Sequence, residues 1–365
     1  MLRIVTLVEN TTSSSEYDCK HGLSFYVETP GHRMLFDVGP NELFLENARK
    51  KGIDLAAVDT VILSHGHYDH GGGLEAFFAV NQTAKVYIRQ TAFEPHFSRV
   101  GDPPKYIGLD KGLMDNAQFI FTGDELVIDD ELHLFSAVEP DPVPSQSNGA
   151  LMMEKDGQMM QDDFVHEQNL ILSVAGEKIL MAGCSHAGID RIQKKAAAII
   201  GRAPDRVIGG FHLYNPSAQK TEPDEVVDET ARALLPTGSL YYTCHCTGPK
   251  AFDRLKIHLG DRLSYMATGS ELLIGAEGID TRCGLKCEGC EYVQSCGCGG
   301  CIATMGKPFH GDCPVAQCCQ NKGFTHCGQC PDLPCDLLTQ YSCDSEHGDN
   351  PAGARIERCR KWAGK

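Results

Sequence analysis

Long apolar segments and positive charge are both scarce in this sequence. No run approaches the roughly 20 apolar residues that a helix needs to cross a bilayer, so we expect no membrane partner. The N-terminus reaches the polar residues Glu9 and Asn10 without a basic or long apolar segment, which predicts a cytoplasmic protein without a signal peptide. Acidic residues exceed basic ones by 49 to 33, and the formal net charge is −16. Nucleic-acid backbones select clustered Lys and Arg, so we expect a small-molecule substrate rather than a nucleic-acid partner.

Cysteine is scarce in the first part of the chain and abundant in the last. Of the 18 cysteines, only Cys19, Cys184, Cys244 and Cys246 precede residue 283. In a chain without an export signal, such a cluster indicates metal ligation rather than a disulfide scaffold. The length and this change in composition predict two domains, a larger one over residues 1–279 and a cysteine-rich one over residues 280–365.

Three histidines and one aspartate fall within six residues, at His65, His67, Asp69 and His70. The apolar run Thr60–Leu63 before them is typical of a strand. Alternate strand residues point to one side, so His65 and His67 can share a face, and the following turn can bring Asp69 and His70 to the same pocket. Imidazole nitrogens and carboxylate oxygens suit zinc, iron or manganese. The stretch predicts two closely spaced metal ions; the alternative, a polar surface loop, leaves four potential ligands unexplained.

The motif His-x-His-x-Asp-His at a strand end resembles the signature of the metallo-β-lactamase-fold hydrolase superfamily. The resemblance covers about residues 1–277. It implies an α/β fold, the αββα sandwich in which outer helices cover two mixed β-sheets. The order of strand-like and helix-like segments in both halves of the chain is consistent with this architecture. Residues 91–118, which contain three prolines, are expected to form an irregular insertion near the substrate pocket.

The resemblance also implies roles for two aspartates. In the superfamily an aspartate at an earlier strand end, here Asp37, supports the metal site from behind, by fixing a ligand imidazole or bracing the loop. A turn-forming aspartate is the alternative for Asp37. Asp69 is expected to orient the hydroxide that the metals generate and to accept its proton.

Two histidines compete for one ligand position. By analogy with class B β-lactamases, His166 before one strand and Cys184 at the end of the next are metal ligands. The segment Gly-Cys-Ser-His that ends at His186 instead resembles a branch related to dihydropteroate-synthase-like, methanopterin-pathway aminobenzene-phosphate synthases. That second resemblance favours His186 as the ligand and leaves His166 as a pocket residue.

Two more histidines follow strand-like segments near the end of the domain. His245 matches the last superfamily ligand, a histidine at a late strand end that precedes small residues and a helix. Its neighbours Cys244 and Cys246 suggest a separate thiolate site, but the spacing is too tight for all three to hold one tetrahedral metal easily. For His212 three roles stay open: substrate binding, proton transfer and structure.

These assignments together predict a two-metal hydrolase. One metal is held by His65, His67 and either His186 or His166, and the other by Asp69, His70 and His245, with Cys184 bridging or binding one of them. We expect two zinc ions, with iron or manganese as alternatives. Two metals lower the pKa of a shared water from about 15.7 toward about 7, and the hydroxide attacks a small phosphorylated or ester substrate. The alternatives are a di-iron or iron–sulfur oxidoreductase and a metal-binding docking protein without catalysis.

The cysteine-rich region contains several Cys-x-x-Cys pairs, a spacing that lets two thiolates grip one tetrahedral ion. Zinc is the first expectation, and an iron–sulfur cluster is the alternative. The opening Cys-Gly-Leu-x-Cys-x-x-Cys and the later Cys-Gly-x-Cys-x-x-x-Pro-Cys are similar to a small uncharacterised cysteine-rich family of bacteria and archaea. The candidate ligands are Cys283, Cys287, Cys290, Cys298, Cys301, Cys327, Cys330 and Cys335. A disulfide-stapled cap is the remaining alternative.

Overall fold

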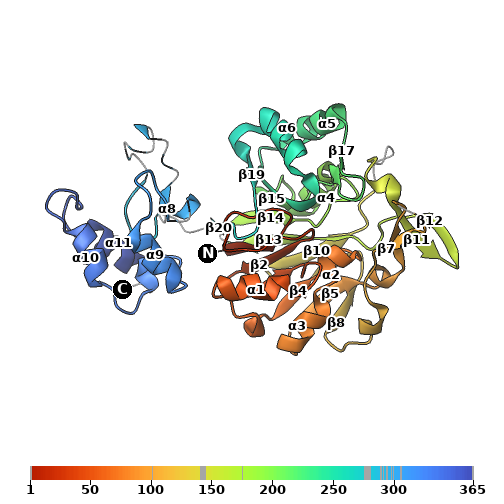
Figure 1. Cartoon of the computed structure of the whole chain (residues 1–365), viewed down its shortest axis with the longest axis horizontal. Coiled ribbons are helices and arrows are strands. Elements are labelled where there is room, and N and C mark those ends of the chain that lie inside the picture. The colour runs from red at the N-terminus through yellow and green to blue at the C-terminus, as the bar shows by residue number, and fades with distance from the viewer. Residues whose placement is uncertain are drawn as a thin grey trace. The chain divides into compact units, whose positions relative to one another are not determined.

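The chain divides into two compact units, Met1–Gly275 and Ala276–Lys365 (Figure 1). A computed structural model describes residues 2–363, apart from 101, 140–144, 175, 275–280, 288–289, 291, 293–294, 297, 299 and 305. The predicted domain boundary at residue 279 lies outside the described residues.

The first sheet has the strand order β20-β1-β2-β3-β4-β5-β8. Its strands are β1 (Leu2–Val8), β2 (Ser24–Glu28), β3 (Arg33–Phe36), β4 (Thr60–Ile62), β5 (Lys85–Arg89), β8 (Phe119–Thr122) and β20 (Glu271–Ile274). β1 pairs antiparallel with β20 and β2, and β2 pairs antiparallel with β3. From β3 onward the pairing through β4 and β5 to β8 is parallel. The carboxyl ends of these parallel strands therefore lie along one edge of a mixed sheet.

The second sheet repeats this design with the order β19-β18-β15-β14-β13-β10-β9. Its strands are β9 (Glu125–Val127), β10 (Leu132–Ser136), β13 (Gln168–Val174), β14 (Glu177–Met181), β15 (Arg206–Gly209), β18 (Leu240–Thr243) and β19 (Leu263–Tyr265). Pairing is antiparallel between β9 and β10, between β10 and β13, and between β13 and β14. β14, β15, β18 and β19 pair in parallel. This sheet, too, has an edge where several strand ends meet.

Alternate residues of the strands supply different apolar clusters. Val61 of β4 packs with Phe44 of α1 (Leu43–Lys50) and Phe77 of α3 (Leu74–Val80). The next residue, Ile62, packs instead with Leu170 and other residues of the second sheet. A strand points successive side chains to opposite faces, so one face of the first sheet meets helices and the other meets the second sheet.

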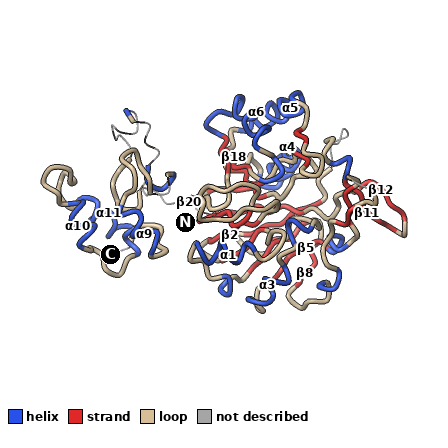
Figure 2. The backbone as a smooth tube through the Cα atoms, viewed as in Figure 1, coloured by secondary structure: helices blue, strands red, loops and turns tan. Residues whose placement is uncertain are grey.

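Three helices cover the outer face of the second sheet. They are α4 (Ile189–Ile200), α5 (Asp224–Leu234) and α6 (Pro249–Leu259). Their buried residues Ile192, Ala231 and Leu255 pack against Val207 of β15 and Tyr241 of β18. The layers are thus helix, sheet, sheet, helix, with the strands between the two sets of helices (Figure 2). This confirms the predicted αββα sandwich.

The insertion over residues 91–118 is more regular than expected. Its strands β6 (His96–Ser98) and β7 (Lys105–Tyr106) join β11 (Leu151–Lys155) and β12 (Gln158–Gln161) in a small sheet of order β12-β11-β6-β7. β6 pairs antiparallel with β11, which lies more than 50 residues away in sequence. Such long-range pairing leaves no local pattern, so the expectation of an irregular segment was wrong. A short ribbon of β16 (Tyr214–Asn215) and β17 (Lys220–Thr221) completes the strands.

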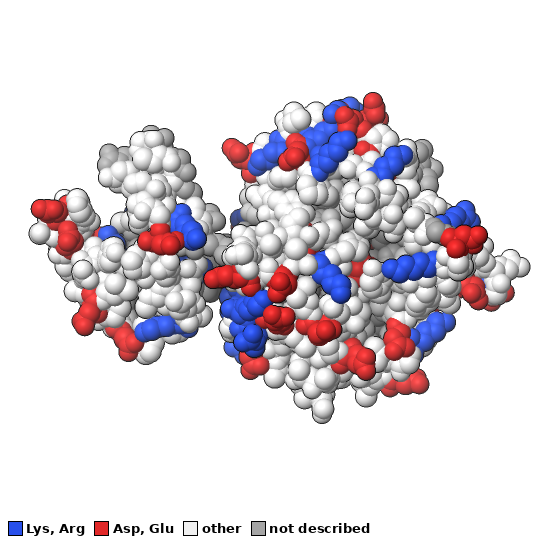
Figure 3. All heavy atoms as spheres, viewed as in Figure 1, with Lys and Arg blue, Asp and Glu red and all other residues white. Residues whose placement is uncertain are grey.

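Charges of both signs are interspersed on the surface that Figure 3 shows. Over α5 and α6, for example, Arg254 pairs with Asp224 and with Asp228. Because the two signs are mixed, that face carries no continuous basic stripe. Among the described residues, no helix is long and apolar enough to cross a membrane.

The second unit is small and mainly helical. Its helices are α8 (Gly300–Ala303), α9 (Pro314–Asn321), α10 (Asp336–Ser342) and α11 (Ala354–Trp362). Its buried cluster consists of Cys283, Val315, Cys319, Cys327, Leu338, Ile356 and Cys359. Cysteine therefore forms more than half of this core, whereas the clusters of the first unit are aliphatic and aromatic.

Candidate metal centre

The candidate ligands follow the carboxyl ends of strands in both sheets. His65 and His67 come after β4, His186 after β14, and His245 after β18, while Asp69 and His70 lie in the short helix α2 (Tyr68–Gly71). Several non-glycine residues in these loops have positive φ angles. They are Asp37 (61°), Ser185 (62°), His212 (50°) and His245 (50°). This conformation is uncommon for residues with a Cβ and tends to occur at functional sites.

The first group of ligand atoms comes from His65, His67 and His186. All three side chains are buried, and one nitrogen of each lies within 4.8 Å of the others. The Nε2 atoms of His65 and His186 are 3.4 Å apart. Burial, followed by the neighbouring imidazoles, holds the pKa of both residues well below the usual value. The group therefore presents neutral imidazoles, which is the form that binds a metal.

The second group comes from Asp69, His70 and His245. The Nε2 atoms of His70 and His245 are 3.2 Å apart, and Asp69 Oδ2 lies 3.7 Å from the first and 3.4 Å from the second. Burial opposes ionisation of Asp69, but His70, His21 and His245 outweigh it and hold the pKa of Asp69 well below its usual range. Cys184 Sγ lies 3.2 Å from His70 Nε2 and also falls in a group with His65. Cys184 thus borders both groups.

Each of four candidate histidines contacts an oxygen through its outer ring nitrogen, Nδ1. The contacts are His65 to Ser64 Oγ (2.9 Å), His70 to Asp37 Oδ2 (2.6 Å), His186 to Asn148 Oδ1 (3.0 Å) and His245 to Asn10 Oδ1 (2.9 Å). Carboxylate and amide oxygens only accept, and the Ser64 hydroxyl already donates to Asp37 Oδ2 at 2.7 Å. The Nδ1 atoms must therefore donate, and the lone pairs of the Nε2 atoms point inward. Four converging lone pairs fit a cation, so the residues present suit a bound metal.

Asp37 ties this arrangement to the backbone. Its Oδ1 accepts from the Ser64 backbone N–H at 2.7 Å, and its Oδ2 contacts both the Ser64 hydroxyl and His70. Burial lowers the pKa of His70, but Asp37 and Asp69 outweigh it and raise the pKa to about 9. The pocket around His70 therefore stabilises a positive charge, which a bound metal ion would supply in place of the proton.

His166 is arranged differently from His186. Its Nδ1 accepts from the Gly66 backbone N–H at 2.9 Å, and its Nε2 lies 3.2 Å from Asp162 Oδ1. Both ring nitrogens are thus used within the protein. The geometry brings His186, and not His166, against His65, because the Gly66 contact turns the His166 ring toward Asp162.

Asp162 is a buried carboxylate that serves a second group of histidines. His96 Nδ1 lies 2.9 Å from Asp162 Oδ2, and His67 Nε2 lies 3.7 Å from the same oxygen. Burial opposes ionisation of Asp162, but His166, His67 and His96 hold the pKa of this carboxyl well below its usual range. Asp162, His67, His96 and His166 form one all-buried group of potential metal ligands. The shared His67 connects this group to the first set of ligand atoms.

His212 and Glu167 also border the centre. The ring of His212 lies 4.2 Å from that of His186, and its buried nitrogens have no hydrogen-bond partner among the described residues. The Glu167 carboxylate accepts from the backbone N–H groups of His186 (2.7 Å) and Ala187 (3.2 Å) and so holds the loop that carries His186. His212 is therefore placed to meet a bound molecule, while Glu167 positions the backbone.

The αββα sandwich and the histidine-rich strand ends define a fold of the metal-binding class. The metallo-beta-lactamase superfamily profile matches residues 17–233, and a family described as a protein of unknown function (DUF3795) matches residues 279–340. The chain belongs to the metallo-beta-lactamase superfamily. Both matches confirm the resemblances that the sequence motifs suggested.

Two relatives from Methanocaldococcus jannaschii are similar to the first unit. One is the 7,8-dihydropterin-6-methyl-4-(β-D-ribofuranosyl)-aminobenzene-5′-phosphate synthase, 28% identical over 268 residues, or 68% of this chain and 89% of the relative. The other is an uncharacterized protein, 29% identical over 260 residues, or 69% of this chain and 93% of the relative. The crystal structure of Tm1679, a metal-dependent hydrolase of the same superfamily, covers 75% of this chain and 99% of its own. Its sequence identity is 29% and its TM-score is 0.65.

Several residues around the centre were not predicted from the sequence. Asn10 and Asn148 orient ligand imidazoles, and Asp162 and His96 form the second buried group. A third case is His21, whose Nε2 lies 3.1 Å from Asp69 Oδ2. None of these residues stands in a recognisable motif. Their only signal is a polar side chain, which many surface residues share.

The candidate cysteines of the second unit do not all lie in the same surroundings. Cys283 and Cys327 lie in its buried cluster, and the Arg282 backbone N–H donates to Cys301 Sγ at 3.2 Å. The Cys290 N–H donates to the Cys287 carbonyl at 3.0 Å. The Cys-x-x-Cys pair of Cys327 and Cys330 lines a pocket.

Proposed function

We propose that the first unit is a two-metal hydrolase of small phosphorylated or ester substrates. The observation that carries this proposal is the pair of adjacent, buried groups of ligand atoms with inward lone pairs. The residues that would hold the metals are His65, His67 and His186 for one ion and Asp69, His70 and His245 for the other, with Cys184 between them. Membership of a superfamily of metal-dependent hydrolases supports the same activity.

Two bound metals would polarise a substrate oxygen and make water a competent nucleophile at neutral pH. The chain supplies the remaining functions. Asp69 stays ionised because its neighbours lower its pKa, so its Oδ2 can accept the proton that water loses. His21 contacts the same oxygen at 3.1 Å and is partly exposed, which gives that proton a route to solvent. His212, with its ring nitrogens unpaired among the described residues, would donate to a substrate oxygen.

The substrate class follows from chemistry and from a relative. Cationic metals and imidazoles bind anionic oxygens, and the relative from M. jannaschii is named for a compound with a 5′-phosphate. We therefore favour a phosphorylated small molecule over a neutral ester. Because that relative is named a synthase, a bond-forming reaction on such a phosphate compound is the second candidate.

The test measures metal content and turnover in the same preparations. We expect about two metal ions per first unit and hydrolysis of model phosphodiesters and lactones by the wild type. The variant Asp69→Asn should lose about 10²–10⁴-fold in turnover, the range for loss of a general acid–base group. Asp124→Asn is the matched control, because the side chain of Asp124 is 70% exposed.

Equal turnover in the wild type and Asp69→Asn would contradict the role of Asp69. Two metals without any hydrolysis would favour the synthase-like reaction, and iron in place of zinc would favour an oxidoreductase.

A further inference from the structure

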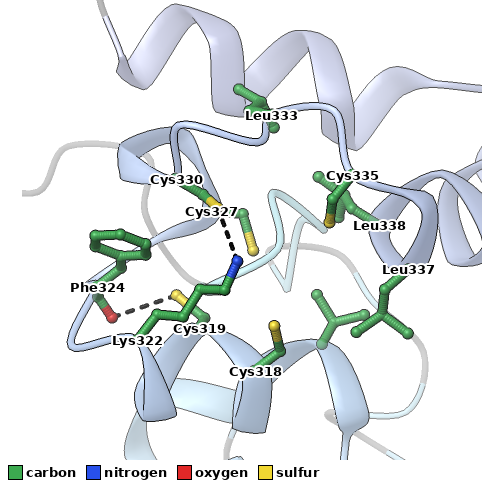
Figure 4. A pocket seen from close by; sticks show the side chains of 11 residues that line it. Cys318, Cys319, Lys322, Phe324, Cys327, Cys330, Leu333, Cys335, Leu337 and Leu338 are labelled. Carbon is green, nitrogen blue, oxygen red and sulfur yellow. Dashed lines mark hydrogen bonds between the residues drawn. The ribbon is translucent and has the colours of Figure 1, made fainter.

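The second unit contains a pocket lined by cysteines from three separate elements. Cys318 and Cys319 come from α9, Cys327 and Cys330 from the following turn, and Cys335 from the start of α10. Figure 4 shows the side chains of these residues around a common space. Such convergence of soft ligands from elements distant in sequence is the arrangement of a thiolate metal site.

The backbone fixes the turn that carries two of the cysteines. The Cys327 N–H donates to the Arg282 carbonyl at 2.7 Å, and the Cys330 N–H donates to the Cys327 carbonyl at 3.1 Å. The side chain of Gln329 accepts from the Thr325 N–H at 2.7 Å. The Cys-x-x-Cys pair is therefore held in one geometry by hydrogen bonds that do not involve the sulfurs.

Only one of the two adjacent cysteines on α9 suits a four-thiolate site in the pocket. Neighbouring helix residues point about 100° apart. Cys319 lies in the buried cluster together with Cys327, and a hydrogen bond between these two thiols raises the pKa of Cys327. Cys318 also lines the pocket but is only partly buried. The contact with Cys327 therefore makes Cys319 the ligand from α9.

The surroundings suit a charged metal–thiolate centre. The pocket walls are apolar, with Leu333, Leu337 and Leu338 among them. Lys322 Nζ donates to Cys330 Sγ at 3.6 Å and so offsets part of the negative charge that four thiolates bring. The apolar walls exclude water, which stabilises the metal–sulfur bonds against exchange.

We propose that Cys319, Cys327, Cys330 and Cys335 together hold one thiophilic metal centre, either a zinc ion or an iron–sulfur cluster. Binding of zinc releases the thiol protons to solvent as the four metal–sulfur bonds form. The proposal is independent of the hydrolase activity, because it concerns residues of the second unit alone. The metal identity is an outcome of the test.

The first experiment compares single variants of the full chain, purified without oxygen. We expect Cys319→Ser and Cys330→Ser each to lose one metal centre, seen as about one zinc per chain or as the visible absorption of a cluster. Cys318→Ser and the exposed Cys343→Ser should keep it. Loss in Cys318→Ser but not in Cys319→Ser would overturn the ligand assignment. Unchanged metal content in Cys319→Ser and Cys330→Ser would overturn the site.

The second experiment uses the wild type and so does not depend on a variant that folds. Cys335 is partly exposed, so as a free thiol it would react with a maleimide. We expect Cys335 to resist alkylation until a zinc chelator, or ferricyanide for a cluster, is added, while Cys343 reacts at once. Equal labelling of Cys335 with and without these reagents would show that no metal protects it, and would overturn the proposal.

Discussion

The two units place potential metal ligands in opposite structural settings. In the first unit, three apolar clusters and two seven-stranded sheets fix the strand ends on which the ligands stand. In the second, the cysteines Cys283, Cys319, Cys327 and Cys359 are themselves part of a small core. A metal bound to a unit with a complete apolar core serves catalysis. A metal bound to a unit with a small apolar core stabilises the fold. Small domains commonly need such a staple, because they bury too little apolar surface.

The largest expected effect is a separation of the two units by metal removal. Chelation should unfold the second unit, because a structural zinc contributes about 10–16 kcal/mol of binding free energy in small domains. The first unit should keep its fold and lose its activity, since its cores are built from apolar side chains. Hydrogen exchange read by mass spectrometry measures the folding of both units in one sample. Protection should vanish in peptides from residues 306–363 and persist in β13 and β14. Simultaneous loss of protection in both units would break the distinction.

The next largest effect separates two histidines within the first unit. His186→Ala should lose about one metal per chain and at least about 10²-fold in turnover, because it removes an imidazole that faces His65. His166→Ala should keep both metals, since its nitrogens contact Gly66 and Asp162 instead. Its cost should be in stability, about 1–3 kcal/mol for unsatisfied buried groups. Metal analysis and denaturant unfolding measure the two quantities, with His258→Ala as a surface control.

A result with equal metal loss in both variants would mean that Asp162 and its histidines hold a metal of their own. That outcome is specific, because His67, His96, Asp162 and His166 already lie within 4.8 Å of one another.

Much of the first unit was predictable because its signals are local. The motif from His65 to His70, the aspartate at Asp37 and the histidine at His245 each stand at the end of a strand with a recognisable apolar pattern. Parallel strands bring such ends to one edge of a sheet, so a list of strand ends already approximates the site. The αββα sandwich followed from the same alternation of strands and helices.

The rest depended on contacts between residues far apart in the sequence. Which of His166 and His186 lies against His65 depends on which ring the Gly66 N–H contacts, a property of loop geometry that no spacing encodes. His96 reaches Asp162 only because β6 pairs with β11. In the second unit, Cys-x-x-Cys spacing identified Cys327 and Cys330 as a pair, but not the helix position that faces them.

A moderate effect is expected from Asp37→Asn. The neutral amide can still accept from the Ser64 N–H, but it no longer favours positive charge at His70. Removal of such a supporting carboxylate typically costs about 10–100-fold in metal affinity. Competition with a chromophoric chelator measures the affinity, and Asp124→Asn again serves as the control. An unchanged metal affinity would mean that Asp37 only stabilises the loop at Ser64. A matched loss of metal from the second unit would contradict the independence of the two sites.

The smallest effect concerns the pH dependence of the first unit alone. His32 Nδ1 lies 2.9 Å from Asp59 Oδ1 and its Nε2 lies 2.6 Å from Asp129 Oδ2, so it connects the two sheets. Burial lowers the pKa of His32, but the hydrogen bonds and charges of the two aspartates raise it above the usual value. The folded state therefore binds the proton more tightly than the unfolded state. The stabilisation is complete below about pH 6.5 and is lost as the pH rises through the folded pKa.

The bridge is partly exposed, so its contribution should be less than about 1 kcal/mol. His32→Gln should flatten the decline in the unfolding temperature of the first unit between about pH 6 and pH 8. The exchange protection of the second unit should keep the same pH dependence in the wild type and the variant, because His32 and both its partners belong to the first unit. An identical slope for the first unit in both proteins would exclude His32 as the titrating group and would leave the buried histidines of the metal centre as the source.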